Sequence, residues 1–251
     1  MSRGGVELLV IGGGITGAGI ARDAAMRGLR TALIERGDFA SGTSSRSSKL
    51  IHGGLRYLEQ GEVGLVLEAA QERRRLRQMA PHLAVAARMA LPVFGRTSAG
   101  LMKLRAGLWA YEKMARIDAE ERHEIWRRDE TLDHIRGLDA NRLQGAAVYT
   151  EYITDDARLT LETVKSAKRA GALVASYAPA IALAEAPGHT VTSGNASSAG
   201  RALRVTVNDE IAGRELVVEA RVVVNASGVP QGVLDLLVAN TNTNVIEIDN
   251  D

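Results

Sequence analysis

Cysteine is absent from this chain of 251 residues. A chain without cysteine has no disulfide framework, no thiolate metal site and no cysteine nucleophile, and its composition fits a reducing compartment. The chain also lacks a run of the roughly 20 apolar residues that a bilayer crossing needs. Even the apolar stretch 172–184 is interrupted by Ser176, Tyr177 and Pro179. We therefore expect a protein that is soluble or lies at a membrane surface.

An excess of charge of either sign is missing as well. The chain has 31 Lys and Arg residues against 30 Asp and Glu residues, for a formal net charge of +1. This balance favours no nucleic-acid partner, because binding to phosphate backbones depends on basic excess. We also expect no metal site. With 45% hydrophobic residues, the chain can form one large domain or two small ones with cores of their own.

A strand, a glycine-rich turn, a helix and a second strand open the chain. Residues 6–11 form an almost continuous apolar run, as buried parallel strands do. Small residues at helical spacing follow over 17–26, and Gly28 is placed to cap this helix. Residues 29–35 have the pattern of a second strand. The order predicts a βαβ unit with a right-handed crossover.

The glycine-rich turn carries the first functional signal. Gly12, Gly14 and Gly17 have the spacing that permits a tight turn, close approach of a pyrophosphate and close helix packing, respectively. The amides at the helix N-terminus would attract phosphates. Glu35 would accept hydrogen bonds from both ribose hydroxyls of an adenosine and repel a 2′-phosphate, although Arg36 weakens that exclusion. The alternative is a glycine turn that binds nothing.

FAD-binding and NAD-binding proteins share this glycine pattern, and the loop after the second strand distinguishes between them. Residues 42–54 are rich in hydroxyl-bearing and small side chains. Such a loop can surround the pyrophosphate, ribityl chain and ring edge of a flavin. The alternative is an exposed flexible linker. The apolar residues Leu50, Ile51 and Leu55 argue against free solvation of the loop.

The segments that follow have mostly helical patterns. We predict helices over 55–80, limited by Pro81, and over 100–116. Four arginines lie on the later turns of the first of these helices, at positions 73, 74, 75 and 77. They are interpreted as a solvated helix face, or alternatively as a contact for acidic lipid headgroups.

The rest of the chain alternates strands with one further helix. The pair Asp155-Asp156 is interpreted as the cap of a helix over 157–169 rather than as two catalytic acids. The alternating runs 203–207 and 216–224 predict a β-hairpin. Nothing in residues 230–251 predicts a packed element.

One block of the chain resembles the FAD-dependent glycerol-3-phosphate dehydrogenase family almost position for position. It spans 37–60 and contains the run Gly-Thr-Ser-Ser-Arg-Ser-Ser-Lys-Leu-Ile-His-Gly-Gly. Supporting similarity lies at 80–83, at 154–159 and at Asn225-Ala226-Ser227-Gly228, where the chain of that family returns to the flavin. The resemblance runs from near residue 6 to near residue 229 and covers the N-terminal half of the family only.

The resemblance implies an α/β fold with a Rossmann-type FAD/NAD(P)-binding domain, formed by residues 1–71 and 147–229. A mostly helical segment, 72–146, would begin a substrate domain. Residues 230–251 would form an irregular tail. The C-terminal part of the family fold, with further substrate-binding residues, would be missing, so the chain would be truncated and of uncertain activity alone.

The same resemblance implies a cofactor, a reaction and a location. FAD would accept a hydride from C2 of sn-glycerol 3-phosphate, which becomes dihydroxyacetone phosphate, and the electrons would pass to a quinone. The protein would be cytoplasmic and peripheral on the inner face of the cytoplasmic membrane. Two alternatives remain open, namely a related flavin oxidoreductase of the amino-acid-oxidase type and an inactive FAD-binding remnant.

The resemblance also assigns individual residues. Near the flavin ring and substrate it places His52, Arg56 and Tyr57. Arg56 suits a phosphate because its planar guanidinium is permanently charged, and a neutral His52 or the Tyr57 hydroxyl could orient the alcohol. The alternatives are a purely structural cofactor contact for His52, a surface ion pair for Arg56 and a core position for Tyr57. The expected FAD-binding residues are Gly12, Gly14, Gly17, Glu35, Arg36, Thr43, Ser44, Ser48, Lys49, Leu50 and Gly228.

Overall fold

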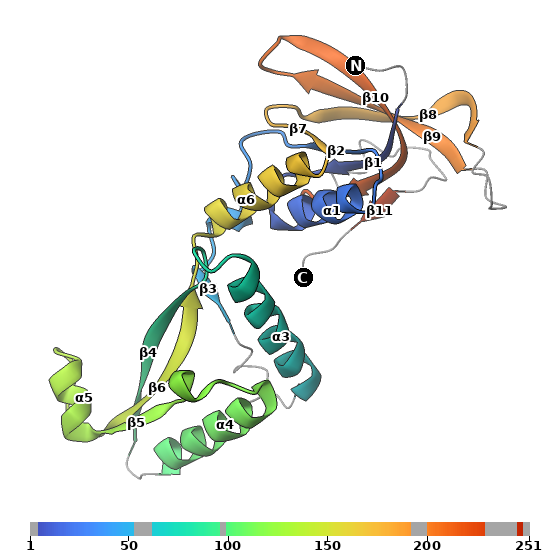
Figure 1. Cartoon of the computed structure of the whole chain (residues 1–251). Helices are drawn as coiled ribbons and strands as arrows, with labels where there is room; N and C mark the ends of the chain where they lie inside the picture. Colours follow the sequence, from blue (N-terminus) through green and yellow to red (C-terminus); the bar gives the residue numbers. More distant parts are fainter. Residues whose placement is uncertain (1–4, 53–61, 96–98, 192–199, 229–244, 248–251) are drawn as a thin grey trace. The chain divides into compact units, whose positions relative to one another are not determined.

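The computed structural model describes residues 5–52, 62–95, 99–191, 200–228 and 245–247 (Figure 1). The chain forms two compact units, one of Met1–Ser47 with Asp156–Asp251 and one of Ser48–Asp155. The chain therefore passes into the second unit after residue 47 and returns to the first at residue 156, whereas the sequence predicted these crossings after residues 71 and 146. The reason is a strand pairing, Leu50 with Ile153, that draws both flanking segments into the second unit.

The first unit contains a seven-stranded sheet in the order β7-β2-β1-β10-β9-β8, with β11 also paired to β10. The predicted βαβ unit is present, since β1 and β2 are parallel neighbours joined through helix α1, and the α/β fold is confirmed. The elements are β1 (Val6–Ile11), α1 (Ile15–Met26), β2 (Thr31–Ile34), α6 (Asp156–Arg169), β7 (Leu173–Ala175), β8 (Ala180–Val191), β9 (Gly200–Asp209), β10 (Arg214–Asn225) and β11 (Val245–Glu247).

Strand β10 carries three partners along its length. Over 220–225 one edge pairs with β1 in parallel. The other edge pairs with β9 over 214–220, which confirms the predicted hairpin, and then with β11 over 223–225. The expectation that 230–251 is irregular throughout is therefore wrong at Val245–Glu247. Strand β9 leaves the last residues of this edge of β10 unpaired, and β11 pairs with them. The sequence near 245–247 gives no local sign of this pairing, because β10 lies some twenty residues earlier in the chain.

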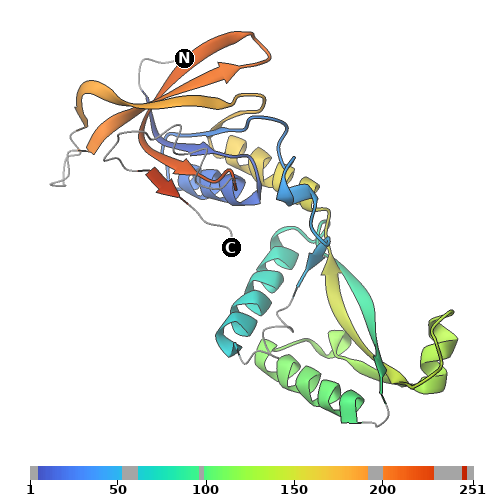
Figure 2. The same ribbon diagram turned by 180° about the vertical axis from the view of Figure 1, so that it is seen from behind.

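Two apolar layers lie on opposite faces of this sheet. Successive residues of a strand point to opposite faces, so Leu9 and Val10 of β1 enter different layers, and both are fully buried. Leu9 packs among strands that include Leu203 of β9, whereas Val10 packs under α1 and α6. In both views of the fold these two helices lie side by side (Figures 1 and 2).

The second unit contains a four-stranded sheet, in which β6 pairs with β3, β4 and β5. The helices expected for residues 72–146 are present, but the same residues also contribute strands β4 and β5 and the start of β6, which the sequence did not predict. Strand β4 pairs with β6 from Val85 opposite Ile153 to Phe94 opposite Leu143, a contact between segments far apart in sequence. The elements are β3 (Leu50–Ile51), α3 (Val63–Met79), β4 (Val85–Phe94), α4 (Ala99–Ala115), η2 (Ala119–Glu121), β5 (Glu124–Arg127), α5 (Arg128–His134) and β6 (Leu143–Ile153).

The arginine run on α3 is not uniformly solvated. The side chain of Arg73 is only 5% exposed, its Nη1 atom lies 3.4 Å from a carboxylate oxygen of Glu151, and its guanidinium lies over the ring of Tyr152. Arg75, by contrast, is 63% exposed and pairs with Glu72 one turn away. The interpretation of a solvated face is therefore wrong for Arg73 and fits Arg75.

Candidate functional site

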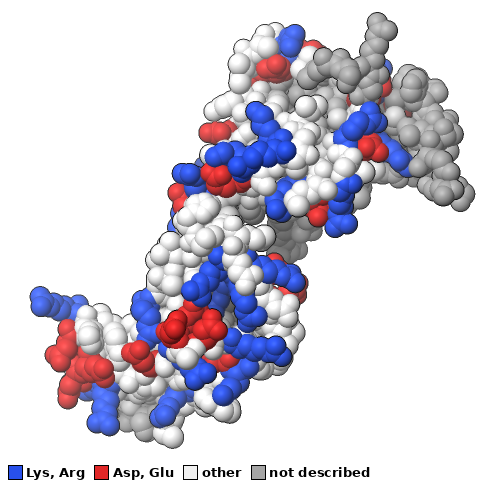
Figure 3. Space-filling model, viewed as in Figure 1, with Lys and Arg blue, Asp and Glu red and all other residues white. Residues whose placement is uncertain are grey.

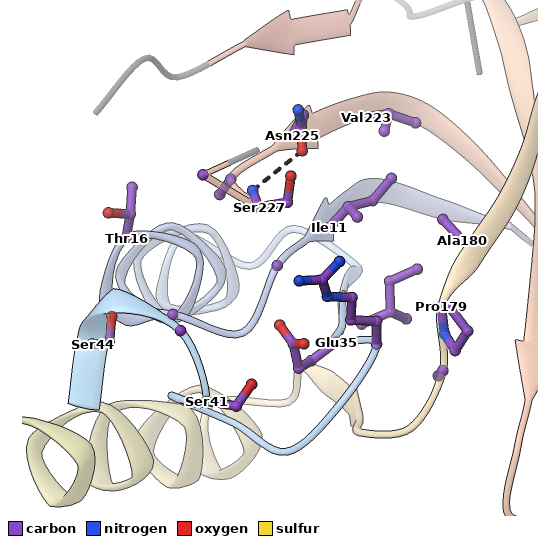
Figure 4. Close-up of a pocket in the computed structure, with 18 of the residues that line it drawn as sticks. Ile11, Thr16, Glu35, Ser41, Ser44, Pro179, Ala180, Val223, Asn225 and Ser227 are labelled. Atoms are coloured by element: carbon purple, nitrogen blue, oxygen red, sulfur yellow. Dashed lines mark hydrogen bonds between the residues drawn. The ribbon is translucent and has the colours of Figure 1, made fainter. Parts of the chain in front are cut away.

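The first unit encloses a cavity of about 380 Å³ at the carboxyl ends of β1 and β2 (Figure 4). Its wall comes from residues 11–16, 34–36, 41–44, 178–183 and 223–228, together with Val205. Ligands of open α/β sheets bind outside the carboxyl ends of the strands, and cavities of this size accommodate small molecules. The position and the volume therefore mark this cavity as the candidate site.

The three glycines of the turn have the geometry that their spacing predicts. Gly12 has a φ of +113°, and a Cβ there would lie 2.5 Å from the carbonyl oxygen of Ala226. A Cβ on Gly17 would lie 1.9 Å from the carbonyl oxygen of Gly12, so only glycine lets α1 pack this closely on the turn. Gly14 borders the cavity itself, where it leaves the backbone accessible to a ligand.

Gly13 has a role that the spacing pattern does not reveal. A Cβ on Gly13 would lie 2.6 Å from the Phe39 ring and 2.8 Å from the Cβ of Glu35. This residue therefore lets the loop after β2 close against the turn. The signal was visible only as an extra glycine within the motif, and the neighbours that require it come from elsewhere in the chain.

The carboxylate of Glu35 faces the turn from the end of β2. One oxygen accepts a hydrogen bond from the backbone N–H of Gly13 at 2.6 Å, and the other accepts one from the N–H of Gly37 at 2.9 Å. A carboxylate offers about four acceptor positions. Glu35 thus braces two loops and retains lone pairs for the hydroxyls of a ligand in the cavity that it lines.

The amino end of α1 forms another part of the wall. The N–H of Ile15 donates to the Ser44 hydroxyl oxygen at 2.9 Å, and Gly14 at the N-cap offers no side-chain cap. No acidic residue lies in the first turn of the helix. The partial positive charge of this helix end therefore faces the cavity, as it does in sites that hold phosphates.

The remaining predicted residues fall into three groups. Arg36, Thr43 and Gly228 line the cavity together with the residues already described. In the second unit lie Ser48, Lys49, Leu50 and His52, and here the hydroxyl oxygen of Ser48 is 3.3 Å from Nε2 of His52. Arg56 and Tyr57 lie outside the described residues.

The sequence did not predict much of the apolar wall of the cavity. It comes from the start of β8 and the strands beside it, and includes Pro179, Leu183, Val205 and Val223. Residues of this kind look like ordinary core residues, so the sequence carries no signal for them. The turn after β10 was recognised as a motif, and Figure 4 shows its internal bond, in which the N–H of Ser227 donates to the Asn225 side-chain oxygen at 3.2 Å.

Comparison with known proteins supplies the family. The model of a family described as FAD dependent oxidoreductase matches residues 7–245. The chain belongs to this family. Its members use FAD, and the cavity fits such a group. Glycines leave room where a Cβ would lie, a helix amino end that can attract phosphates lies in the wall, and so does a carboxylate that can accept hydrogen bonds from ribose hydroxyls.

Individual members of the FAD-dependent oxidoreductase family add detail. The chain is 40% identical over 222 residues to an aerobic glycerol-3-phosphate dehydrogenase of Staphylococcus saprophyticus subsp. saprophyticus, covering 88% of this chain and 38% of that protein. It is 35% identical to the solved glycerol-3-phosphate dehydrogenase of Bacillus halodurans complexed with FAD, with a TM-score of 0.67, covering 94% of this chain and 36% of that one. The chain thus spans well under half the length of these relatives.

Amino-acid-oxidizing members of the family are more distant. The glycine oxidase of Bacillus cereus superposes with a TM-score of 0.53 over 89% of this chain and 55% of that one, but at 19% identity. This similarity concerns the fold alone. The sequence similarity of this chain therefore lies on the side of the glycerol-3-phosphate dehydrogenases.

Proposed function

We propose that this chain forms the FAD-binding part of an enzyme that oxidises sn-glycerol 3-phosphate to dihydroxyacetone phosphate. The observation that carries the proposal is the cavity at the glycine turn, with Glu35 and the amino end of α1 in its wall. The 40% identity to a glycerol-3-phosphate dehydrogenase supports the choice of substrate. FAD, when bound, supplies the hydride acceptor.

The protein groups would bind and orient the cofactor. The amino end of α1 would attract the pyrophosphate, with Gly14 leaving room for its close approach, and Glu35 would accept hydrogen bonds from the adenosine ribose. Thr43 and Ser44 would offer hydroxyls to the same region, and Arg36 and Gly228 would contact the cofactor from the other walls. These assignments rest on the lining of one cavity.

Substrate binding is proposed for residues of the second unit. Arg56 would bind the phosphate, and His52 or Tyr57 would orient the alcohol at C2. The Ser48 hydroxyl lies 3.3 Å from Nε2 of His52, so it can orient the imidazole ring whichever ring nitrogen carries the proton. Ser48, Lys49 and Leu50 would contact the flavin.

Oxidation of added substrate tests the function. Purified chain reconstituted with FAD should be yellow and should bleach with glycerol 3-phosphate in the absence of oxygen. Bleaching by an amino acid would instead favour an oxidase of that class. Yellow chain that ignores both substrates would support an inactive FAD-binding remnant. A chain that retains no flavin would overturn the proposed function.

A quinone acceptor and contact with an anionic membrane surface complete the proposal. None of the helices in the described part of the chain has both the length and the apolar character to cross a bilayer. Helix α4 exposes Met102 and Trp109, 68% and 59% accessible, beside the cations Lys103, Arg105 and Lys113. Apolar side chains with flanking cations suit the interface of an anionic bilayer.

Figure 3 shows Lys and Arg side chains interspersed with Asp and Glu side chains over the second unit. The proposed contact therefore rests on α4 rather than on a basic excess of the whole unit. The chain should therefore float with vesicles that contain anionic lipid and not with neutral ones. Trp109→Ser together with Met102→Ser should abolish flotation, whereas equal binding of this variant would count against α4 as the contact.

A further inference from the structure

Asp156, the first residue of α6, holds a loop that borders the cavity of the first unit. One carboxylate oxygen accepts a hydrogen bond from the Ser47 hydroxyl at 2.7 Å and one from the Ser47 backbone N–H at 3.3 Å. The other oxygen accepts from the N–H of Ala157 at 2.9 Å. Both oxygens of this half-buried carboxylate are thus engaged, and the bonds from Ser47 link segments more than a hundred residues apart in sequence.

The segment that Asp156 holds is the serine loop, residues 42–47. It is a single turn of 3-10 helix, Thr43–Ser45, closed by a hydrogen bond from the N–H of Ser45 to the carbonyl of Gly42 at 3.2 Å. In its middle, Ser44 accepts the hydrogen bond from the N–H of Ile15 in the first turn of α1. The serine loop therefore bridges the amino end of α1 and the amino end of α6.

The two helices that anchor the serine loop are themselves fixed against each other. Val164 and Ala167 of α6 are buried in the same apolar cluster as Ala18 and Ala21 of α1. A hydrogen bond from Arg22 of α1 to the Ser166 hydroxyl, at 2.9 Å, lies beside this cluster. Because the helices cannot shift independently, the bond at Asp156 sets where the serine loop stands over the cavity.

We propose that Asp156 is a positioning residue for the cofactor. This proposal rests on the proposed function, in which FAD occupies the cavity. A charged acceptor makes stronger hydrogen bonds than a neutral one, so Asp156 keeps Ser47 in place before the cofactor arrives. Thr43 and Ser44 then already line the cavity in the FAD-free chain. The entropy cost of ordering the serine loop is therefore not subtracted from the free energy of FAD binding.

Removal of either partner should weaken FAD binding without removing any residue that lines the cavity. Asp156→Ala and Ser47→Ala should each raise the Kd for FAD about tenfold, measured by quenching of flavin fluorescence. Ser47→Thr keeps the hydroxyl donor and should restore the affinity. Glu162→Ala serves as the matched control, because it removes a carboxylate of the same helix that pairs with Arg158 and Lys165 on the surface.

Amide hydrogen exchange in the FAD-free chain separates this proposal from the proposed function. Exchange at Ile15 and in the serine loop should accelerate in Asp156→Ala and Ser47→Ala, and remain unchanged in Glu162→Ala. If exchange accelerates but the wild-type chain binds no FAD, the function fails and the loop-holding role stands. Unchanged exchange together with unchanged affinity would overturn the proposal. Should Asp156→Ala not fold, Ser47→Ala and Ser47→Thr decide the question.

Discussion

The two units of this chain bury charge in different ways. In the first unit the sheet lies between two apolar layers, represented by Leu9 and Val10, and the carboxylate of Glu35 lines a cavity. In the second unit Arg73 and Glu151, each about 5% exposed, lie inside the fold. A buried pair depends on both members, whereas a close-packed apolar layer responds to changes in side-chain volume and shape. The first unit should therefore be sensitive to shape and the second to loss of charge.

The largest effect should follow removal of the buried cation. Arg73→Ala leaves Glu151 without its partner in the interior, and the free energy of unfolding should fall by about 3–5 kcal/mol in urea denaturation. Arg75→Ala removes an exposed cation from the same helix, whose pair with Glu72 is solvated. This control should change stability by less than about 1 kcal/mol. Equal decreases in the free energy of unfolding of the two variants would show that the second unit does not depend on the buried charge pair.

In the first unit the largest effect should come from one added methyl group. Gly17→Ala places a Cβ on the carbonyl of Gly12, so the turn or α1 must move, at a cost of about 1–3 kcal/mol in stability. Gly19→Ala lies on the same helix, where a Cβ meets nothing within 4 Å. It should be neutral or stabilise the chain by up to about 1 kcal/mol through helix propensity. Urea denaturation checks both, and a harmless Gly17→Ala would contradict the close packing.

A smaller effect, at the cavity and the two loops beside it, should follow neutralisation of the Glu35 carboxylate. Glu35→Gln keeps one oxygen acceptor for the amides of Gly13 and Gly37 but loses the charge. The Kd for FAD should rise about tenfold, since a charged acceptor contributes up to about 1.5 kcal/mol more than a neutral one. Fluorescence titration measures this change. Unaltered affinity would mean that Glu35 serves only to brace the loops.

A last effect, seen only at alkaline pH, should appear as a pH dependence of the second unit. Burial, together with the hydrogen bond to Glu121, raises the pKa of Tyr152 from 10.0 to about 12. The unfolded chain then loses this proton before the folded one does, so stability is complete below pH 10 and falls as the pH rises toward 12. Thermal unfolding across this range should show a steeper decline for the wild type than for Tyr152→Phe. Parallel curves would show that Tyr152 titrates normally.

The first unit was also the more predictable of the two, for a physical reason. Its glycine turn, α1 and hairpin are built from contacts between neighbouring segments, so spacing and periodicity predicted them. In the second unit, β4 and β6 are held together by pairing over a long sequence separation, and residues such as Ala86 and Met89 carry no strand preference that would mark them. Its helices α3 and α4 were recognised, but its sheet was not.

The sequence alone determined the dinucleotide turn, because only glycine satisfies the positive φ at Gly12 and the close approach at Gly17. Tertiary structure decided the rest of the site. It placed Pro179 and Val205 in the cavity wall, buried Arg73 and brought Asp156 to Ser47. Local backbone conformation depends on adjacent residues, so the sequence reveals it. A cavity wall or a hydrogen bond such as that between Ser47 and Asp156 depends on which distant segments become neighbours when the whole unit packs.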